Sequence, residues 1–531
     1  MAGRTKKLQT KYKVLEILSP EGYKELVYAD RPKNLSQLLS NTVAKHGSLE
    51  AIITPDDRLT YHQFASWVEN ASSGLYHHYG VRKGDRVSLM LRNGWEFGVI
   101  FFALVNIGAT AVPLNIAYKG EEASFQINDS GSKMVVVDEE FLDVIMGVKS
   151  EISHVKNIIV TGKEEFKDLI NKRGVKEVDI PVDEADSAVI MYTSGTTGRP
   201  KGAVLSHRGM IAEAMCISEL FDWQAGRDKN LCPVPLFHVT GLVMDFCAAV
   251  YAGIASVFMK KFSAMDALKV IQEERVTTMI GVPTILWLML NNPEFDRYHL
   301  SSLRGYGAGG SATPEELMTL CLKKLPQLNL CPGYGLTEAC GMTLTTTTTH
   351  EALSHKGSVG RPIPLIDVKV VDYEGKELPS DEPGELLIKG CQTLKEYWNN
   401  PEATQRSLTA GWLHTGDIAK IDEEGYVYIL DRMKDMINRG GEKIWSLEVE
   451  NVLYRNPKIL EAAAVGVPDP VFGEEVKAVV VLKEGEKATT EEIQEFCGRF
   501  LAKFKVPKYV EFRESLPRNP AGKVIKEKLK H

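Results

Sequence analysis

The 531-residue sequence lacks the features that mark metal-binding, secreted or nucleic-acid-binding chains. Its eight cysteines are scattered without a C-x-x-C pair, so neither a zinc cage nor a redox dithiol is indicated. No apolar segment near residue 1 resembles a secretory signal. The charge balance of 63 Lys and Arg against 70 Asp and Glu gives −7, which offers no basic surface for DNA or RNA. We therefore expect a cytoplasmic protein with reduced thiols and no nucleic-acid partner.

Long apolar runs are also scarce. The nearest to a membrane span is residues 97–114, but Asn106, Gly108 and Pro113 interrupt it. This pattern predicts a short helix, a turn and a strand of a buried core. No integral membrane segment is expected.

What the sequence does have is length and alternation. A chain of this size exceeds what one hydrophobic core supports, so at least two domains are expected. Helix-like and strand-like segments alternate over most of the chain, which is typical of parallel sheets with crossover helices. Short strands between residues 368 and 388 suggest a small, more antiparallel subdomain. The last hundred or so residues contain enough strands and helices for a separate α+β domain, and we place the boundary at Lys434.

The stretch YTSGTTGRPKG, residues 192–202, follows a strand-like segment and precedes a helix-like one. Its glycines free backbone amides, its hydroxyls add donors and its lysine adds a charge, which together favour a phosphate-binding loop over an ordinary surface loop. It is not a Walker loop, because Pro200 precedes the lysine and Gly202 follows it. The candidate phosphate contacts are Thr193, Ser194, Gly195, Thr196, Thr197, Gly198 and Lys201.

This stretch closely resembles the signature loop of the adenylate-forming enzymes, which include acyl-CoA synthetases, adenylation domains and beetle luciferases. Further stretches of that family occur in the expected order: PLFHVTGL (235–242), GAGGSA (307–312), GYGLTEA (333–339), GWLHTGD (411–417), DRMKDMINRGGEKI (431–444) and PRNPAGKV (517–524). The resemblance implies a large N-terminal domain, residues 1–433, with two helix-flanked, mainly parallel sheets and a small β-barrel-like subdomain. A small mobile α+β domain, residues 434–531, is implied to follow.

By this resemblance, several residues bind the nucleotide. Gly309 and Gly310 lie against adenine, Tyr334 beside Gly335 stacks on it, and Thr337 donates to the α-phosphate. GAGGSA also fits a dinucleotide fingerprint, but the surrounding pattern does not complete one. The resemblance further implies that Asp417 binds the ribose hydroxyls and that Arg432 contacts ribose or phosphate oxygens.

The resemblance also assigns the metal and the catalytic groups. Glu338, with Thr193, is implied to bind Mg²⁺ together with phosphate oxygens, which is a ligand set that Mg²⁺ prefers. Lys523 resembles the family's catalytic lysine, which stabilises the charge that gathers as a carboxylate attacks the α-phosphorus. His238 is expected to gate or face the acid, although a lone histidine of this kind is more often part of a core.

The small domain is implied to serve the second half-reaction. Lys434 occupies the family's hinge position, and Gly440, Gly441 and Lys443 are implied to line a tunnel for coenzyme A after the domain rotates. From the residues alone, the glycine pair would also suit the turn that starts a helix.

The sequence thus predicts an acid:CoA ligase that uses ATP, Mg²⁺ and coenzyme A and passes through an acyl-AMP. A medium- or long-chain fatty acid is the expected substrate, because small pocket residues (Gly307, Ala308, Gly309, Gly333) suggest space beside apolar ones. An alicyclic or aryl acid, transfer to a carrier protein, a luciferase-like oxygenase and a nucleotide-binding scaffold stay open as alternatives. The oligomeric state is also open, with a homodimer as one option.

Overall fold

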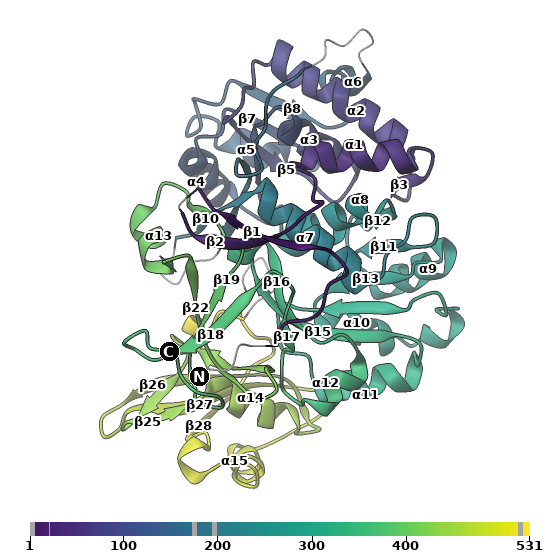
Figure 1. Ribbon diagram of the computed structural model, residues 1–531. Helices are drawn as coiled ribbons and strands as arrows, with labels where there is room; N and C mark the ends of the chain where they lie inside the picture. The colour runs from purple at the N-terminus through teal and green to yellow at the C-terminus, as the bar shows by residue number, and fades with distance from the viewer. Residues whose placement is uncertain (1–5, 21, 172–177, 194–198, 519–523, 531) are drawn as a thin grey trace. The chain divides into compact units, whose positions relative to one another are not determined.

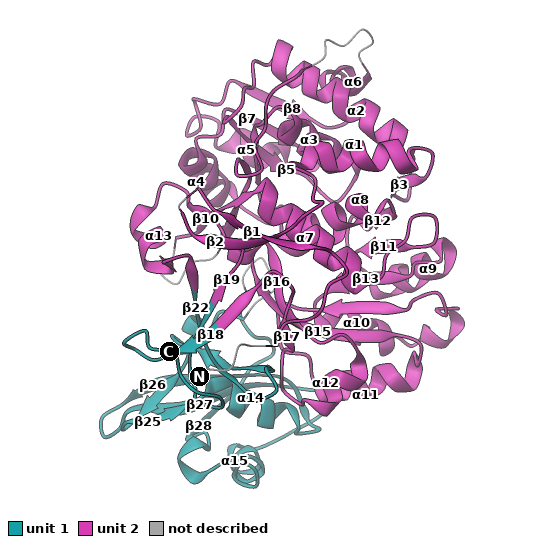
Figure 2. Ribbon diagram, viewed as in Figure 1, with its two compact units in different colours: residues 1–3, 369–387, 414–531 teal, residues 4–368, 388–413 magenta. Residues whose placement is uncertain are grey.

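The computed structural model describes residues 6–20, 22–171, 178–193, 199–518 and 524–530 (Figure 1). The chain forms two compact units, coloured separately in Figure 2. Unit 1 comprises residues 1–3, 369–387 and 414–531, and unit 2 comprises residues 4–368 and 388–413. The domain boundary predicted at Lys434 stays a prediction.

The first large sheet of unit 2 has seven strands in the order β20-β10-β9-β6-β5-β7-β8. The strands from β9 to β8 run parallel, whereas β10 is antiparallel to β9 and β20 to β10. All four residues of β7 are buried, as expected for a parallel strand that is covered on both faces. The strands are β5 (Arg86–Met90), β6 (Thr110–Pro113), β7 (Met134–Val137), β8 (Asn157–Val160), β9 (Ser187–Thr193), β10 (Lys201–Ser206) and β20 (Glu396–Tyr397).

The second large sheet of unit 2 has nine strands in the order β17-β16-β15-β14-β13-β11-β12-β3-β4. Its central strands from β15 to β3 are parallel, and antiparallel strands extend both edges. The strands are β3 (Glu50–Ile53), β4 (Arg58–Thr60), β11 (Lys229–Cys232), β12 (Ala255–Phe258), β13 (Thr278–Gly281), β14 (Gly305–Ala308), β15 (Asn329–Leu336), β16 (Gly341–Thr345) and β17 (Arg361–Pro362).

The helices of unit 2 include two that are buried over most of their length. Helix α3 (Trp95–Asn106) is buried from Phe97 to Val105 and leads into β6, which confirms the core helix, turn and strand predicted for residues 97–114. Across the described residues, no helix is both long and apolar enough to span a membrane. The other buried helix is α7 (His207–Leu220). The remaining helices are α1 (Leu35–His46), α2 (Tyr61–Ser73), α4 (Gly120–Ser130), α5 (Leu142–Gly147), α6 (Glu164–Asn171), α8 (Ala248–Ala252), α9 (Ala264–Glu274), α10 (Pro283–Leu290), α11 (Glu315–Lys324), α12 (Thr349–Ser354) and α13 (Pro401–Ser407).

Unit 1 is built around a five-stranded sheet in the order β25-β24-β27-β26, with β28 parallel to β27. Apolar side chains of the strands pack with helices α14 and α15 into one core that includes Val449, Val480 and Ile493. Helix α15 starts with a capping box in which Thr489 and Glu492 satisfy each other's backbone amides. The elements are β24 (Ile437–Arg439), β25 (Glu442–Ile444), α14 (Ser446–Tyr454), β26 (Ile459–Asp469), β27 (Gly473–Leu482), α15 (Thr490–Gly498), β28 (Tyr509–Phe512) and the 3₁₀ turn η7 (Lys526–Leu529).

Two smaller sheets complete the fold. One has the order β18-β19-β22-β21, with β23 paired to β22, and accounts for the short strands predicted from residue 368 onward. The other is a two-stranded antiparallel sheet of β1 and β2. Their strands are β1 (Val14–Leu18), β2 (Lys24–Tyr28), β18 (Asp367–Val371), β19 (Gly384–Lys389), β21 (Leu408–Thr409), β22 (Trp412–Ile421) and β23 (Val427–Arg432).

Candidate active site

The two residues predicted to bind a metal meet in unit 2. Thr193 ends β9, and Glu338 lies in the 3₁₀ turn η5 (Thr337–Ala339) that follows β15. The Thr193 hydroxyl donates to Oε1 of Glu338 at 3.2 Å. Two segments 145 residues apart in sequence are thereby joined at one carboxylate oxygen.

A tyrosine that the sequence analysis missed contacts the same oxygen. The hydroxyl of Tyr397, in β20, donates to Oε1 of Glu338 at 2.9 Å. Its ring is 5.1 Å from Nζ of Lys201, the first residue of β10. A tyrosine beside glutamate and tryptophan carries no chemical signature in sequence, because the same pattern is typical of a core strand.

The site suits Mg²⁺ better than an all-protein metal cage. Within the described ranges, no three His, Cys, Asp or Glu side chains come close enough to hold a metal, and Oε2 of Glu338 makes no hydrogen bond there. Mg²⁺ is commonly held by one or two carboxylates and completes its shell with phosphate oxygens and water. One carboxylate oxygen without a hydrogen-bond partner among the described residues therefore fits that ion.

The secondary structure on either side of the glycine-rich stretch differs from the prediction. Thr193 pairs with Lys201 and Tyr192 with Gly202 in the antiparallel β9–β10 pair, so a strand that was not predicted separates the loop from α7. That strand pairs on its other side with β20, a partner almost two hundred residues away that local sequence does not reveal. Five predicted contacts lie outside the described residues: Ser194, Gly195, Thr196, Thr197 and Gly198.

The residues predicted to hold adenine lie at the carboxyl ends of two adjacent strands. Parallel pairing of β14 with β15 sets Ala308 opposite Pro332, and a Cβ on Gly309 would lie 3.7 Å from the Gly333 carbonyl. Gly310 has φ +79°, in the left-handed region that favours glycine. The carboxyl edge of a parallel sheet is where such folds bind ligands.

The remaining residues of this group, Tyr334, Gly335 and Thr337, span the end of β15 and the start of η5. Tyr334 and Thr337 are half-buried, whereas Gly335 is exposed. A Cβ on Gly335 would come within 1.9 Å of the Gly341 carbonyl oxygen. Only glycine therefore lets β15 and β16 approach so closely just before Glu338.

The glycines expected to widen the acid pocket do not all leave space. A Cβ on Gly307 would meet the ring of Phe221 at 3.1 Å, and one on Gly333 would meet the Leu344 carbonyl at 3.0 Å. These glycines allow close packing within the sheet, so their small size is no measure of pocket volume. The argument for a long acyl group from small residues is therefore wrong at these two positions.

His238 precedes η3 (Thr240–Cys247), a π-helical segment. Its ring is half-buried and packs on Phe237 with centroids 4.6 Å apart. The π-helix lies against β16, since a Cβ on Gly341 would be 2.9 Å from Cγ of Met244. π-Helical turns are frequent at functional sites, but the proposed substrate-facing role of His238 stays a prediction.

In unit 1, Asp417 and Arg432 form an ion pair across β22 and β23. The two residues are register partners, and Nε of Arg432 lies 3.3 Å from Oδ1 of Asp417. The aspartate is buried, whereas the arginine side chain is 53% exposed. The pair thus presents a carboxylate and a guanidinium side by side, as contacts to a ribose and a phosphate require.

Gly440 and Gly441 form the two-residue turn between β24 and β25. Both have positive φ, +59° and +95°, as the turns of tight hairpins require. The glycine pair therefore ends a β-hairpin and does not begin a helix. Lys443, in β25, donates to the Tyr373 hydroxyl at 2.6 Å.

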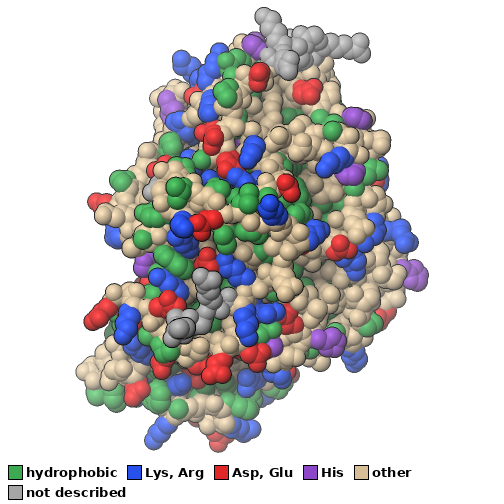
Figure 3. Space-filling view, in the orientation of Figure 1, with side chains coloured by type: hydrophobic (Ala, Val, Ile, Leu, Met, Phe, Trp, Pro, Cys, Tyr) green, Lys and Arg blue, Asp and Glu red, His purple; other side chains and the backbone are tan. Residues whose placement is uncertain are grey.

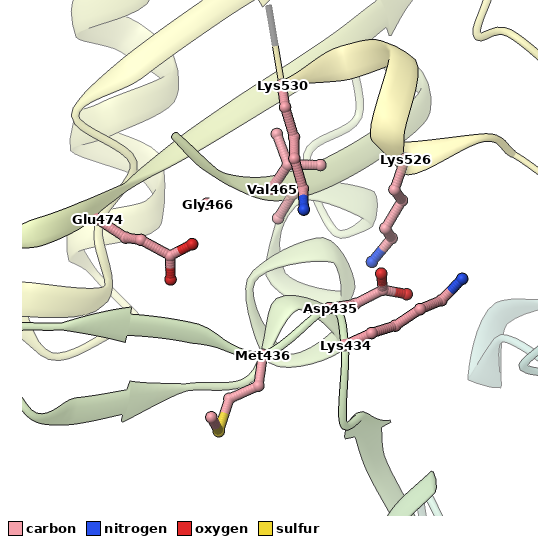
Figure 4. Close-up of a pocket in the computed structure, with 9 residues that line it drawn as sticks. Lys434, Asp435, Met436, Val465, Gly466, Glu474, Lys526 and Lys530 are labelled. Atoms are coloured by element: carbon pink, nitrogen blue, oxygen red, sulfur yellow. The ribbon is translucent and has the colours of Figure 1, made fainter. Parts of the chain in front are cut away.

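The predicted hinge residue Lys434 lines a pocket of unit 1 (Figure 4). Lys526 and Lys530 lie on another side of it, and Asp435 and Glu474 line it as well, so its charges are mixed. Lys523 lies outside the described residues.

Residues 524–530, just after Lys523, contact other parts of unit 1 through Lys526. Lys526 forms an ion pair of 2.7 Å with Glu450 and donates to the Ser446 hydroxyl at 2.6 Å. The same hydroxyl donates to Asp431, the buried neighbour of Arg432, at 2.8 Å. Burial raises the pKa of the Asp431 carboxyl, although Lys526 and the Ser446 hydroxyl partly offset this shift.

Surface charge does not favour a polyanion on the face shown in Figure 3, where cationic and anionic side chains are interspersed. All eight cysteines are free and buried. Burial raises the pKa of every one of these thiols, so none is an activated nucleophile.

Comparison with known proteins gives consistent matches. A family model described as AMP-binding enzyme matches residues 39–398, and one described as AMP-binding enzyme C-terminal domain matches residues 448–523. The long-chain-fatty-acid–CoA ligase FadD13 of Mycobacterium tuberculosis is 36% identical over 94% of this chain and 98% of its own length. A long-chain-fatty-acid–CoA ligase of Bacillus subtilis is 34% identical over 94% of each chain.

Among solved structures, the o-succinylbenzoate coenzyme A synthetase MenE of Bacillus subtilis, in complex with ATP and magnesium ion, is similar throughout. Its TM-score is 0.83 at 31% identity, over 93% of this chain and 99% of that chain. The predicted fold class is thereby confirmed.

Proposed function

Because the chain belongs to the family of AMP-binding enzymes, we propose that it joins a medium- or long-chain fatty acid to coenzyme A through an acyl-AMP. The enzyme class predicted from sequence, an AMP-forming acid–thiol ligase, is that of the relatives. The predicted use of ATP and magnesium matches the ligands of the MenE complex. Fatty acids are favoured because both relatives named above are long-chain ligases.

One observation carries the proposal for the first half-reaction: the Thr193 and Tyr397 hydroxyls donate to Oε1 of Glu338, while Oε2 accepts no hydrogen bond from the described residues. Bound Mg²⁺ would neutralise phosphate charge and keep the pyrophosphate ready to leave. Lys201 and the loop after Thr193 would hold the β- and γ-phosphates, and Tyr334 with Gly309 and Gly310 would hold adenine. Thr337 and Lys523 would stabilise the α-phosphate as the acid carboxylate attacks it.

For the second half-reaction, we propose that the domain of residues 434–531 presents a different surface. Rotation about Lys434 would withdraw Lys523 and bring the Gly440–Gly441 turn and Lys443 to the coenzyme A channel. The thiol would then attack the acyl-AMP carbonyl and displace AMP, whose ribose Asp417 and Arg432 would hold during the attack. A cytoplasmic location and a homodimer stay predictions.

The test is isotope exchange of pyrophosphate into ATP with purified protein, Mg²⁺ and acids of graded length. We expect exchange that depends on the acid and is strongest with a medium or long fatty acid, then release of AMP and acyl-CoA when coenzyme A is added. If the protein catalyses exchange with none of the acids in the panel, the proposal is refuted.

A second substrate class is an aryl acid, since the MenE relative acts on o-succinylbenzoate. Benzoate- and coumarate-like acids belong in the same panel. A higher kcat/KM for one of them than for every fatty acid would select this alternative.

A further inference from the structure

Tyr397 stands between two residues of the proposed phosphate and metal site. Its hydroxyl donates to Glu338 at 2.9 Å, and the Lys201 ammonium lies 5.1 Å from its ring centroid. Only 7% of the tyrosine is exposed. The ring of Tyr397 attracts the Lys201 ammonium, and its hydroxyl binds the Glu338 carboxylate. One side chain therefore fixes the positions of both charges.

The backbone around Tyr397 is fixed to the same two segments. Tyr397 is the register partner of Ala203 in β10, and Trp398 N–H donates to the Gly202 carbonyl at 2.7 Å. At the other end of the segment, Leu394 N–H donates to the Glu338 carbonyl at 2.7 Å. Residues 394–398 therefore connect the strand that carries Lys201 to the turn that carries Glu338.

The Tyr397 hydroxyl donates to the same carboxylate oxygen of Glu338 as the Thr193 hydroxyl. Because Oε1 of Glu338 accepts from both Tyr397 and Thr193, the carboxylate cannot rotate freely. In the described part of the chain, Oε2 is left without a hydrogen bond and is the oxygen available to a cation.

We propose that Tyr397 is a positioning residue that orients Glu338 for the metal of the metal–ATP complex and sets its distance from Lys201. This inference rests on the proposed function, because it assigns Glu338 to the metal. Tyr397 acts through Glu338 and Lys201 and touches neither metal nor phosphate itself. Its effect should therefore appear in metal binding and in adenylation, and not in the step that consumes acyl-AMP.

The test uses the full chain with Tyr397→Phe, which keeps the ring and removes only the hydroxyl. Losing a hydrogen bond to a charged group should raise the Mg²⁺ concentration for half-maximal pyrophosphate exchange about tenfold. Thioester formation from supplied acyl-AMP should stay within twofold of the unmodified protein. A readout independent of turnover is the affinity for Mn²⁺ in the presence of a non-hydrolysable ATP analogue, measured from the EPR signal of free Mn²⁺. This affinity should weaken by a similar factor in Tyr397→Phe.

Tyr428→Phe is the matched control. Its hydroxyl also donates to a carboxylate, Asp422, at 3.1 Å, but in a sheet that contributes no metal ligand. We expect no change in Mn²⁺ binding for this variant. Tyr397→Leu tests the ring as well, and it should further lower the salt-sensitive affinity for the ATP analogue without Mn²⁺, since Lys201 loses its aromatic neighbour.

The outcomes separate this inference from the proposed function. If the unmodified protein binds Mn²⁺ and ATP analogue and Tyr397→Phe binds them equally well, the positioning role is wrong. If both half-reactions fall equally with unchanged Mn²⁺ affinity, the tyrosine is merely structural and the inference is again overturned. If binding of Mn²⁺ and the analogue weakens in Tyr397→Phe as expected, but the unmodified protein catalyses pyrophosphate exchange with none of the acids tested, the ligase proposal fails while the positioning role holds.

Discussion

The predicted site residues of the two units are held in contrasting ways. In unit 2, Glu338 is fixed by side chains from segments 145 and 59 residues away in sequence. In unit 1, Asp417 pairs with Arg432 on the next strand, and the two glycines form one hairpin turn. The first arrangement exists only when the whole of unit 2 is folded, whereas the second is built into short local hairpins.

This difference suits a division of labour. Adenylation needs charges that are placed before the reaction begins, and long-range contacts between buried strands provide such placement. A domain that presents two surfaces in turn, as proposed for residues 434–531, needs surfaces that keep their shape in both arrangements. The β24–β25 hairpin, closed by Gly440 and Gly441, meets that need.

The largest expected effect tests whether the two half-reactions use different parts of unit 1. Lys523→Ala should slow pyrophosphate exchange about 100-fold or more, because one preplaced charge at the transition state is lost. Thioester formation from supplied acyl-AMP should persist. The control is Lys528→Ala, which removes an exposed lysine of the same tail and should leave both rates unchanged. Equal loss of both half-reactions in Lys523→Ala would contradict the rotation.

A pH experiment tests how much the stability of unit 2 depends on a buried histidine in its interior. His207 starts α7, its Nδ1 accepts from Leu35 N–H at 3.2 Å, and burial lowers its pKa from 6.5 to about 4. In the unfolded chain the His207 ring is therefore protonated below pH 6.5, whereas in the folded chain it stays neutral down to about pH 4. The stabilisation of the folded state by neutral His207 is complete above pH 6.5 and is lost as the pH falls toward 4.

From pH 7.5 to 5.0, the free energy of unfolding should drop by about 2 kcal/mol through this residue. Urea unfolding at the two pH values measures the drop. His207→Asn keeps an acceptor for Leu35 N–H and removes the titrating ring, so its stability should vary correspondingly less with pH. The same pH dependence in both proteins would rule out His207 as the source.

Local patterns predicted the elements well, and contacts between distant segments account for what was missed. The interruptions within residues 97–114 correctly gave α3, a turn and β6, since glycine and proline act on their own neighbours. Strand β10 was missed because its pairing with β20 depends on residues almost two hundred positions away. Resemblance brought Thr193 and Glu338 into one site, yet it gave no hint of Tyr397.

The glycines show the same limit. Gly441 was singled out for function, and its positive φ shows that the turn itself also requires glycine. Gly307 and Gly333 were expected to leave space, but Phe221 and the Leu344 carbonyl occupy it. Sequence shows where a side chain is absent, whereas only the packed structure shows what fills the gap.

A smaller effect is expected from the hairpin turn. Gly441→Leu should slow thioester formation about tenfold while adenylation continues, so that acyl-AMP accumulates. The substitution also strains a backbone at φ +95°, which costs about 1 kcal/mol. Gly485→Leu, at φ +82° in open space, carries the same strain and serves as the control. Adenylate accumulation no greater than in the unmodified protein would count against the coenzyme A channel.

The smallest expected effect concerns stability at the Asp417–Arg432 pair. Because the arginine side chain is 53% exposed, solvent screens the pair, and Arg432→Gln should change the free energy of unfolding by less than about 1 kcal/mol. The KM for ATP should nevertheless rise several-fold, since the guanidinium is proposed to contact the nucleotide. Arg406→Gln removes an arginine from an exposed pair with Glu402 and should alter neither quantity. If Arg432→Gln instead lowered stability by several kcal/mol with an unchanged KM, the pair would be part of the scaffold, and unit 1 would depend on its charged residues as unit 2 depends on its interior.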